Sequence, residues 1–479
     1  MESVLESRSN AEPGPRRGSF PSTTVPIIED ITVQDENDSE IIEDFPDGGI
    51  KAYFVLFGSF LGLTVCFGLL NSIGAIQAYL SQNQLKDVHS STVAWIFSIL
   101  FCISYSFSIF VGPYFDTHGP TVPLVGGAIL TVGGLLAVAN SQNVWQFILS
   151  LSICVGIGLA LCFTPLVAVV SQWFYLKRGR ATGLATTGGS VGGIVIPLLL
   201  RGLYPKVGFS WAIRTLALLC LGCMIIAILL AKGRTIRGSN PSPGDSSNDG
   251  IDLDPEASHE KSTGKKFKQL FFGGDVRYLD FSHFLDMKYT FLTVGIFLEE
   301  LALMLIVTYF ATYAISQGAS ESDSYLLLTV FNATGIPGRW IPGHFSDIIG
   351  HFNVMLLMLT GVCLSVFLIW LPFGNHHSVL WVFAAVCGFF SASILSLTPV
   401  CLGSITPHRQ FGERFGMMYA IVSIGNLFGF PMAAAIIGNG SKKNYDIFVV
   451  FCGILVILGT ISIATSRYFI VGLKLNVKV

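Results

Sequence analysis

Charged residues are scarce in this chain. Asp, Glu, Lys and Arg together make up 12% of its 479 residues, whereas an ordinary soluble domain carries about 25%. The charges also nearly balance, with a formal net charge of −2, so the composition does not point to a nucleic-acid partner. Hydrophobic residues make up 52% of the chain. This composition excludes an ordinary soluble globular protein and favours one that lies in a lipid bilayer.

Patterns typical of catalysis and metal binding are also missing. The sequence contains no pairing of a nucleophile with a base, no zinc-ligand spacing and no phosphate-binding loop. All ten cysteines fall in apolar segments, where an oxidising exterior cannot readily pair them. Cys220 and Cys223 form a CxxC motif, but it lies within one apolar helix and lacks the context of a redox motif. We therefore expect no enzyme, no bound metal and no cofactor.

Twelve apolar segments of membrane-spanning length are the main feature that is present. A bilayer core requires about 20 mostly apolar residues per helix, and these segments lack the two-residue alternation of a transmembrane β-strand. We predict an all-α membrane protein with 12 transmembrane helices in two groups of six. The predicted spans are 52–76, 92–113, 121–140, 145–170, 181–201, 211–231, 288–316, 324–345, 351–372, 378–402, 413–437 and 446–471.

Polar stretches divide the chain into five parts. We predict a disordered cytoplasmic tail (1–47), a first six-helix bundle (48–231), a cytoplasmic linker (232–287), a second six-helix bundle (288–471) and a short cytoplasmic tail (472–479). The first tail lacks the basic start, apolar run and cleavage site of a secretory signal. Serines of the linker are either phosphorylation sites or part of a plain solvated segment. Of the 28 Lys and Arg residues, 21 lie in the tails and in the loops on the same side, which predicts that both termini are cytoplasmic.

An internal repeat relates the two bundles. The segment GPYFDTHG at 112–119, after the second predicted span, reappears as GHFSDIIG at 343–350, after the eighth. We predict that the bundles share one topology and enclose a substrate site at their interface near the middle of the membrane. Three further matches recur at almost the same spacing along the chain, namely Thr164-Pro165 with Thr398-Pro399, Gly183 with Gly416, and Pro197 with Pro431.

The repeated motif, Gly-x-x-x-Asp-x-x-Gly, has two interpretations. Its glycines let helices approach closely and turn sharply, and its Asp can accept hydrogen bonds from the N-terminus of a neighbouring helix. It is either a conformational latch that breaks and reforms as the bundles rock, or a static staple of a loop. The residues concerned are Gly112, Asp116 and Gly119 in the first copy and Gly343, Asp347 and Gly350 in the second.

The repeated motif resembles the signature of the major facilitator superfamily. Thr117, His118 and Pro120 replace the basic residues that are usual in its first copy. Two further segments are similar to signatures of the monocarboxylate porter family: PDGG at 46–49 and WFYLKRGRATG at 173–183, the latter followed by a glycine-rich run. The resemblance extends from Asp47 to the end of the chain.

Within that family the chain is most similar to fungal homologues, and especially to the yeast riboflavin transporter branch. The similarity rests on FGLLNS at 67–72, GIPGRW at 335–340 and WLPFG at 370–374. This resemblance implies a plasma-membrane transporter that moves riboflavin, or a similarly flat heteroaromatic solute, by alternating access and without a cofactor. Its expected partners are the small-molecule substrate and the lipid bilayer.

Two departures bear on coupling. The lysine that acid-carrying members have in their first helix aligns with Asn71, and the aspartate of their eighth helix aligns near Gly335, so only the arginine of that helix is retained, as Arg339. The resemblance therefore does not favour proton–lactate cotransport of the usual kind. A proton-coupled transporter of monocarboxylates or other organic anions remains the first alternative, and a non-transporting nutrient sensor the second.

Four polar residues are candidate substrate contacts. An arginine inside an apolar helix costs about 2.5–3.5 kcal/mol on insertion scales, so Arg339 is expected to face a cavity or a partner. It either binds the substrate or pairs with a helix-end carbonyl. Asn71, Gln77 and Asn332 lie on helices expected to border the cavity, where each is either a substrate contact or an interhelical hydrogen bond.

Glu299 and Glu300 are candidates for proton coupling. Neighbouring residues on a helix point about 100° apart, so at most one of the two easily faces a cavity. The other must find a partner or take up a proton, and a stabilising contact with Arg339 or a neighbouring helix is the alternative role. Aromatic residues, 12% of the chain, suit the binding of a flat ring, but the sequence does not identify which of them lie near the substrate.

Overall fold

Helices account for the regular structure of the computed structural model, which describes residues 46–234, 281–407, 410–438, 440–474 and 477–478. Within these ranges there is no β-strand, as an all-α fold requires. The predicted N-terminal tail lies outside the described residues apart from its last two, and so does most of the linker, including its serines between 238 and 262.

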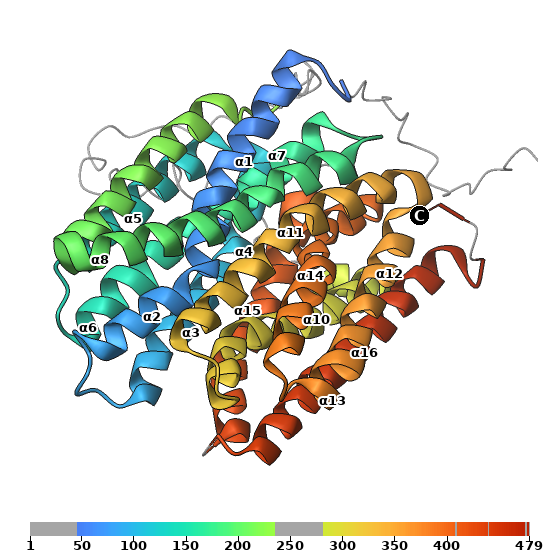
Figure 1. Ribbon diagram of the computed structural model, residues 1–479. Helices are drawn as coiled ribbons and strands as arrows, with labels where there is room; N and C mark the ends of the chain where they lie inside the picture. Colours follow the sequence, from blue (N-terminus) through green and yellow to red (C-terminus); the bar gives the residue numbers. More distant parts are fainter. Residues whose placement is uncertain (1–45, 235–280, 408–409, 439, 475–476, 479) are drawn as a thin grey trace, which may run out of the picture. The chain divides into compact units, whose positions relative to one another are not determined.

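The helices fall into a first half (residues 48–231) and a second half (288–471) of the chain (Figure 1). The first half contains α1 (Ile50–Asn71), α2 (Ile73–Gln82), α3 (Ser90–Ser106), α4 (Ser108–His118), α5 (Thr121–Val138), α6 (Val144–Phe147), the π-helix η1 (Ile148–Val155), α7 (Gly156–Trp173) and α8 (Arg178–Leu230). The second half contains α10 (Met287–Ser316), α11 (Glu321–Ile349), α12 (His351–Leu364), the π-helix η3 (Ser365–Trp370), α13 (Leu371–Phe373), α14 (His377–Ser404), α15 (Phe411–Ile437) and α16 (Lys442–Val471). A 3-10 helix, η2 (Phe281–Leu285), precedes α10.

The predicted spans correspond to these helices. Ten helical stretches among the described residues are long and apolar enough to cross a membrane. One of them, α8, holds the two predicted spans 181–201 and 211–231, which meet at Gly208, where a φ of 73° breaks the helical geometry. The predicted span 324–345 lies in α11, which is not among the ten because polar residues such as Arg339 lower its hydropathy.

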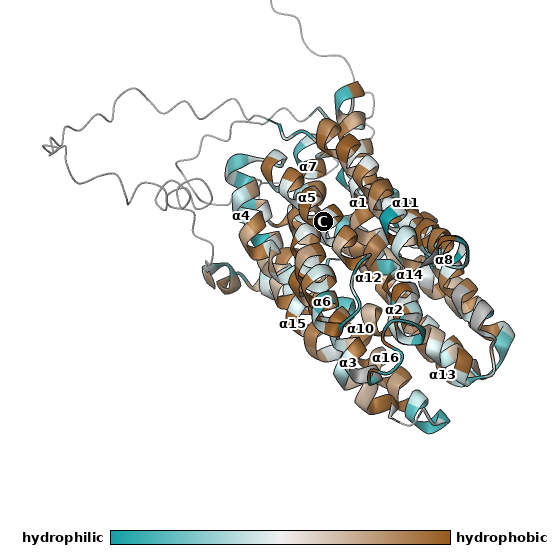
Figure 2. Cartoon of the chain, turned by 90° about the vertical axis from the view of Figure 1, so that its left-hand side faces the viewer, coloured by the Kyte–Doolittle hydropathy of each residue, from teal (hydrophilic) through white to brown (hydrophobic). Residues whose placement is uncertain are grey.

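The surface of these helices suits a hydrocarbon environment. Figure 2 shows hydrophobic residues along most of the helix lengths, with hydrophilic residues concentrated near the helix ends and loops. Large apolar side chains such as Leu218, Leu357 and Phe428 are more than 60% exposed. In water such exposure would be costly, whereas lipid tails solvate it, so the structure supports the multi-pass membrane protein that the sequence predicts.

A break near the end of the first predicted span lies at the site. Helix α1 ends at Asn71, and α2 starts at Ile73. The hydroxyl of Ser72 donates to the carbonyl oxygen of Gly68 at 2.5 Å, a local bond of the kind that bends helices. The bend carries α2 along one side of the cavity described below.

The two halves meet along two helix pairings. Helix α8 packs on α11, and α15 packs on α3 and α4. Glycines make both crossings close: a Cβ atom on Gly112 would overlap the carbonyl oxygen of Gly412, and one on Gly179 would approach that of Gly343. The glycines at the two crossings correspond in the repeat. Gly112 and Gly343 are the first residues of the two copies of the motif. Gly179 and Gly412 also correspond, because each lies four residues before a member of the matched pair Gly183 and Gly416.

Candidate substrate-binding site

A cavity of about 620 Å³ lies between the two halves. Its walls come from α1, α2, α3 and α8 of the first half and from α10, α11 and α15 of the second. The volume is within the range of about 300–1,000 Å³ that is usual for pockets that bind small molecules. A cavity with walls from both halves changes shape whenever the halves move against each other.

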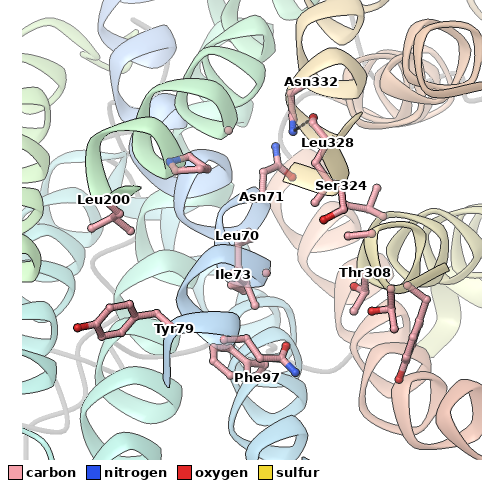
Figure 3. Close-up of a pocket in the computed structure, with 18 of the residues that line it drawn as sticks. Leu70, Asn71, Ile73, Tyr79, Phe97, Leu200, Thr308, Ser324, Leu328 and Asn332 are labelled. Carbon is pink, nitrogen blue, oxygen red and sulfur yellow. Dashed lines mark hydrogen bonds between the residues drawn. The ribbon is translucent and has the colours of Figure 1, made fainter. Parts of the chain in front are cut away.

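Three of the four predicted substrate contacts line this cavity: Asn71, Gln77 and Asn332. Figure 3 shows Asn71 and Asn332 at the same end of the close-up. The amide nitrogen of Asn71 donates to the carbonyl oxygen of Gly189 at 3.3 Å, and that of Asn332 donates to the carbonyl oxygen of Leu328 at 3.0 Å. These bonds fix which way each amide points, leaving both side-chain oxygens as acceptors for a solute. We call this pair the amide floor.

Arg339, expected either to bind the substrate or to pair with a helix-end carbonyl, bonds to a backbone carbonyl within α8. It does not belong to the cavity lining and is 4% exposed. Its Nη1 donates to the backbone carbonyl of Thr186 on α8 at 2.7 Å, and its guanidinium lies 5.8 Å from the ring centre of Phe67. A Cβ on Gly189 would lie 3.0 Å from the same Nη1, so Arg339 sits directly behind the residue to which Asn71 bonds.

Glu299 and Glu300 point into different surroundings, as their angular separation requires. Glu300 accepts a hydrogen bond from the hydroxyl of Tyr419 at 3.4 Å and interacts electrostatically with Arg339, both in its own half. It also interacts electrostatically with Tyr105 of α3 in the first half, which places it at the interface between the halves. Glu299 accepts from the hydroxyl of Thr460 at 3.1 Å, which places it inside the second half between α10 and α16. Both side chains are fully buried. Of the two acids, only Glu300 is near a predicted substrate-binding residue.

Five aromatic side chains lie around the buried pair of Arg339 and Glu300. We call them the aromatic cluster: Phe67, Tyr105, Phe163, Phe415 and Tyr419. Phe163 is at its centre, with ring centres 5.0 Å from Tyr419 and 5.1 Å from Phe67. The cluster combines residues of both halves next to Arg339, which is 4% exposed. Within the described residues, Tyr105 Oη, Glu300 Oε2 and Arg339 Nε are buried without a hydrogen-bond partner.

The repeated Asp residues both reach across to the opposite half. The carboxylate of Asp116, near the end of α4, accepts from the backbone nitrogens of Gly412 and Glu413 at 3.0 and 2.9 Å. That of Asp347, near the end of α11, accepts from Gly179 and Arg180 at 2.7 and 2.9 Å. Each carboxylate therefore binds the unsatisfied N–H groups at the start of a helix.

Glycines frame these Asp contacts. Gly112 and Gly343 make the close crossings described above, whereas Gly119 and Gly350 end α4 and α11 with φ values of 79° and 111°. The crossings lie at one end of the helices and the cavity at the other. Along α8, Gly179 at the crossing and Gly193 in the cavity wall are separated by about 20 Å at 1.5 Å per residue.

The two segments similar to monocarboxylate porter signatures contact each other. Asp47 Oδ1 accepts from the backbone nitrogens of Tyr175 and Lys177 at 2.7 and 3.3 Å. The ammonium of Lys177 in turn donates to the carbonyl oxygen of Asp47 at 3.1 Å. The start of α1 is thereby tied to the loop before α8, the helix whose N-terminus Asp347 binds.

The cavity is nearly free of formal charge. Among the described residues that line it, Arg201 on α8 is the one charged side chain, and it is exposed. The other polar groups are amides, hydroxyls and phenols, such as Asn71, Thr308 and Tyr309. Such a lining suits a neutral solute with several hydrogen-bonding groups better than a small anion.

The fold and the site together describe a transporter, and comparisons with known proteins identify its family. The sequence model of the Major Facilitator Superfamily matches residues 52–371 and 292–472, so the chain belongs to this superfamily. It is 39% identical over 448 residues to the riboflavin transporter MCH5 of Saccharomyces cerevisiae, covering 92% of this chain and 82% of that one. It is also 32% identical over 434 residues to the MFS-type transporter opdF of Penicillium oxalicum, covering 91% and 94%. These relatives are transporters, in agreement with the expectation that the chain is not an enzyme.

Solved structures agree on the fold. The fucose:proton symporter FucP of E. coli superposes with a TM-score of 0.61 at 16% identity, covering 86% of this chain and 98% of that one. The proton:xylose symporter XylE superposes with a TM-score of 0.63 at 12% identity, covering 88% and 96%. The predicted all-α fold of the major facilitator type is therefore confirmed.

Several residues of the site were not singled out from the sequence. The aromatic cluster and the cavity phenylalanines Phe101 and Phe430 are ordinary members of a chain with 38 Phe. The repeat carried one usable signal, because Phe430 immediately precedes Pro431, which the repeat had marked. Tyr105 and Tyr419 had no such signal, since only the packing of α3 against α15 brings them within 5.2 Å of each other.

Proposed function

We propose that this protein transports riboflavin, or a similarly flat neutral heteroaromatic solute, across the plasma membrane by alternating access as a facilitator of diffusion. The nearly uncharged cavity between the halves is the observation that carries this proposal. The relative named as a riboflavin transporter, 39% identical over 92% of this chain, supports the choice of solute. Membership of the fungal branch of the monocarboxylate porter family is part of the same proposal.

Alternating access is supported by a difference between the two ends of the interface, because the halves are in contact at one end and apart at the other. Around Asp116 and Asp347 the halves are joined by hydrogen bonds and glycine contacts. At the other end they are separated by the cavity. We propose that the two Asp contacts are conformational latches: breaking them opens that face, and the cavity closes as the halves rock. With both termini cytoplasmic, the latched face is the cytoplasmic one.

The residues of the amide floor are proposed to bind the solute first. The free side-chain oxygens of Asn71 and Asn332 accept from N–H or hydroxyl donors of a flavin, and Gln77 on α2 adds a further amide. Arg339 is proposed to meet the solute later. Once the halves separate at the latched face, its guanidinium, now bonded to Thr186, becomes available to the ring carbonyls or the ribityl hydroxyls.

A proton-coupled organic-anion transporter is the second candidate. The observation in its favour is the buried pair of Arg339 and Glu300, with Tyr419 bonded to the acid. A carboxylate substrate binding Arg339 would compete with Glu300, which would then take up a proton. Against it, the cavity lining itself offers an anion a single cation, Arg201, at the surface of α8.

Uptake of radiolabelled riboflavin distinguishes the two candidates. Cells that express this chain are compared with cells that lack it, with lactate and pyruvate measured in parallel. We expect saturable riboflavin uptake that depends on the chain, and no uptake of either acid above background. Accumulation of lactate with alkalinisation of the medium, and no flavin uptake, would establish the organic-anion transporter instead.

A further inference from the structure

One face of α10 presents two threonines to the cavity. The residues of α10 that line it recur at the spacing of a single helix face, among them Met304, Thr308, Thr312 and Ile315. Thr308 and Thr312 are one turn apart, or about 6 Å at 1.5 Å per residue. We call them the threonine pair. Their apolar neighbours on this face leave the two hydroxyls as a short polar patch on α10.

The protein itself does not use these hydroxyls. A threonine in an α-helix commonly donates its hydroxyl hydrogen to the backbone carbonyl one turn earlier, and Thr293 on the same helix does so with Tyr289 at 2.9 Å. Among the described residues, neither Thr308 nor Thr312 has a side-chain hydrogen-bond partner. The hydroxyl of Tyr309, which also lines the cavity, is instead bonded to a backbone carbonyl of α15. The threonine pair is therefore available to a solute.

The opposite wall offers a further free polar group. Gln77 on α2 lines the cavity, and its side chain makes no hydrogen bond within the part of the chain that the structure describes. In Figure 3, Thr308 lies across the cavity from Ile73, the first residue of α2. A solute chain held between α10 and α2 thus meets hydroxyls and an amide, all of which both donate and accept hydrogen bonds.

We propose that the threonine pair binds a hydroxylated chain of the solute and so determines which flat heteroaromatic solutes the protein accepts. This inference rests on the proposed function, because riboflavin carries a ribityl chain with hydroxyls on successive carbons. A hydroxyl both donates and accepts, so such a chain satisfies the threonine pair and also donates to the acceptor oxygens of the amide floor. A carboxylate only accepts, and those oxygens offer it no donor.

The threonine pair lies away from the buried pair of Arg339 and Glu300. Thr308 is eight residues beyond Glu300 on α10, about 12 Å along the helix axis. Arg339 is not part of the cavity lining. The hydroxylated chain can therefore bind α10 while Arg339 still donates to the carbonyl oxygen of Thr186. Recognition of the chain thus belongs to the conformation in which the latched face is closed.

The test removes each hydroxyl and nearly keeps the shape of the side chain. Thr308→Val and Thr312→Val are made in the purified full chain. Dissociation constants are measured for riboflavin and for lumiflavin, which has the flavin ring without the ribityl chain. We expect each variant to weaken riboflavin binding about fivefold, the size of one neutral hydrogen bond, and to leave lumiflavin binding unchanged. The matched control is Thr293→Val on the same helix, which should bind both flavins as the unaltered chain does, because the Thr293 hydroxyl is bonded within α10.

Two further measurements distinguish recognition of the chain from a structural role of the threonines. Thr308→Ser and Thr312→Ser keep a hydroxyl and should retain the riboflavin affinity of the unaltered chain. The unaltered chain should itself bind riboflavin more tightly than lumiflavin, which leaves the threonine pair without a partner.

Three results would overturn the role of the threonine pair and leave the proposed function standing. They are equal affinity of the unaltered chain for the two flavins, unchanged riboflavin binding in both valine variants, and an equal loss of riboflavin and lumiflavin binding in those variants. Failure of the unaltered chain to bind any flavin would overturn both proposals.

Discussion

The carboxylate of Asp347 accepts a 2.7 Å hydrogen bond from the backbone nitrogen of Gly179, joining the end of α11 to the start of α8. The other copy of the repeated motif makes the equivalent contact, with Asp116 bonded to Gly412 at 3.0 Å. The two contacts differ in one respect, because the next residue is Arg180 at the first and Glu413 at the second. Glu413 is accompanied by His283 of η2, whose Nε2 lies 3.3 Å from its Oε1.

Removing the charge of either latch should shift the protein towards the conformation that is open at this face. In Asp347→Asn, one oxygen can no longer accept as a carboxylate does, and a charge-assisted hydrogen bond is worth about 1.5–3 kcal/mol. We expect a cysteine placed in the cavity to react more slowly with an impermeant maleimide, because the cavity closes as the latch opens. Asp87→Asn, an exposed residue of the α2–α3 loop, is the control and should leave the rate unchanged. An unchanged rate in Asp347→Asn would instead support a static loop staple.

A methyl group at a latch glycine should block transport by preventing the close crossing. A Cβ on Gly112 would overlap the carbonyl oxygen of Gly412, which is backbone and cannot rotate away. We expect Gly112→Ala to reduce uptake at least tenfold at unchanged surface expression. The control is Gly222→Ala on α8, because a Cβ there meets no atom within 4 Å. Normal uptake by Gly112→Ala would show that the crossing need not close during the cycle.

Replacement of Arg339 by alanine should abolish flux while leaving the protein at the cell surface. The variant removes the bond to Thr186 across the interface and leaves Glu300 buried without its opposite charge. Uptake and surface biotinylation are measured together. Arg214→Ala is the control, because Arg214 contacts Asn140 and Trp211 within the first half. Unchanged flux in the Arg339 variant would remove it from the set of substrate-binding residues.

Any pH dependence of uptake should run through Glu300 and not through Glu299. Glu300 interacts electrostatically with Tyr105 of the first half, across the interface, so rocking changes its access to water and protons. Glu299 is bonded to Thr460 within one half, and its surroundings move as a rigid body. We expect Glu300→Gln to flatten the pH profile of uptake, and Glu299→Gln to retain the profile of the unaltered chain. A flattened profile in the Glu299 variant alone would reverse this assignment.

Much of the fold was predictable because its signals are local. Apolar length defines a membrane span whatever its neighbours are, and the repeated Asp motifs disclosed the pairing of the halves. The sequence did not predict the details that depend on how the helices join and pack against one another. Hydropathy divided residues 181–231 correctly into two spans, but it did not reveal that they join at a single residue, Gly208.

The site was predictable in part for the same reason. Polar residues in apolar helices stand out, so Asn71, Gln77 and Asn332 could be named, and all three line the cavity. The depth of Arg339 behind Gly189 could not be deduced, because it depends on how closely α8 and α11 approach. This reasoning could not identify the aromatic residues of the site, since sequence composition and spacing do not distinguish a phenylalanine that faces lipid from one that faces the cavity.

The most direct test of the account is whether riboflavin occupies the cavity between the halves. Gln77, which lines the cavity, is replaced by cysteine, and the rate of labelling by a membrane-impermeant maleimide is measured against the unaltered chain with its ten native cysteines. We predict rapid labelling from one side of the membrane that slows in proportion to riboflavin saturation and is unaffected by lactate. Labelling that riboflavin leaves unchanged, or that lactate slows instead, would contradict the account.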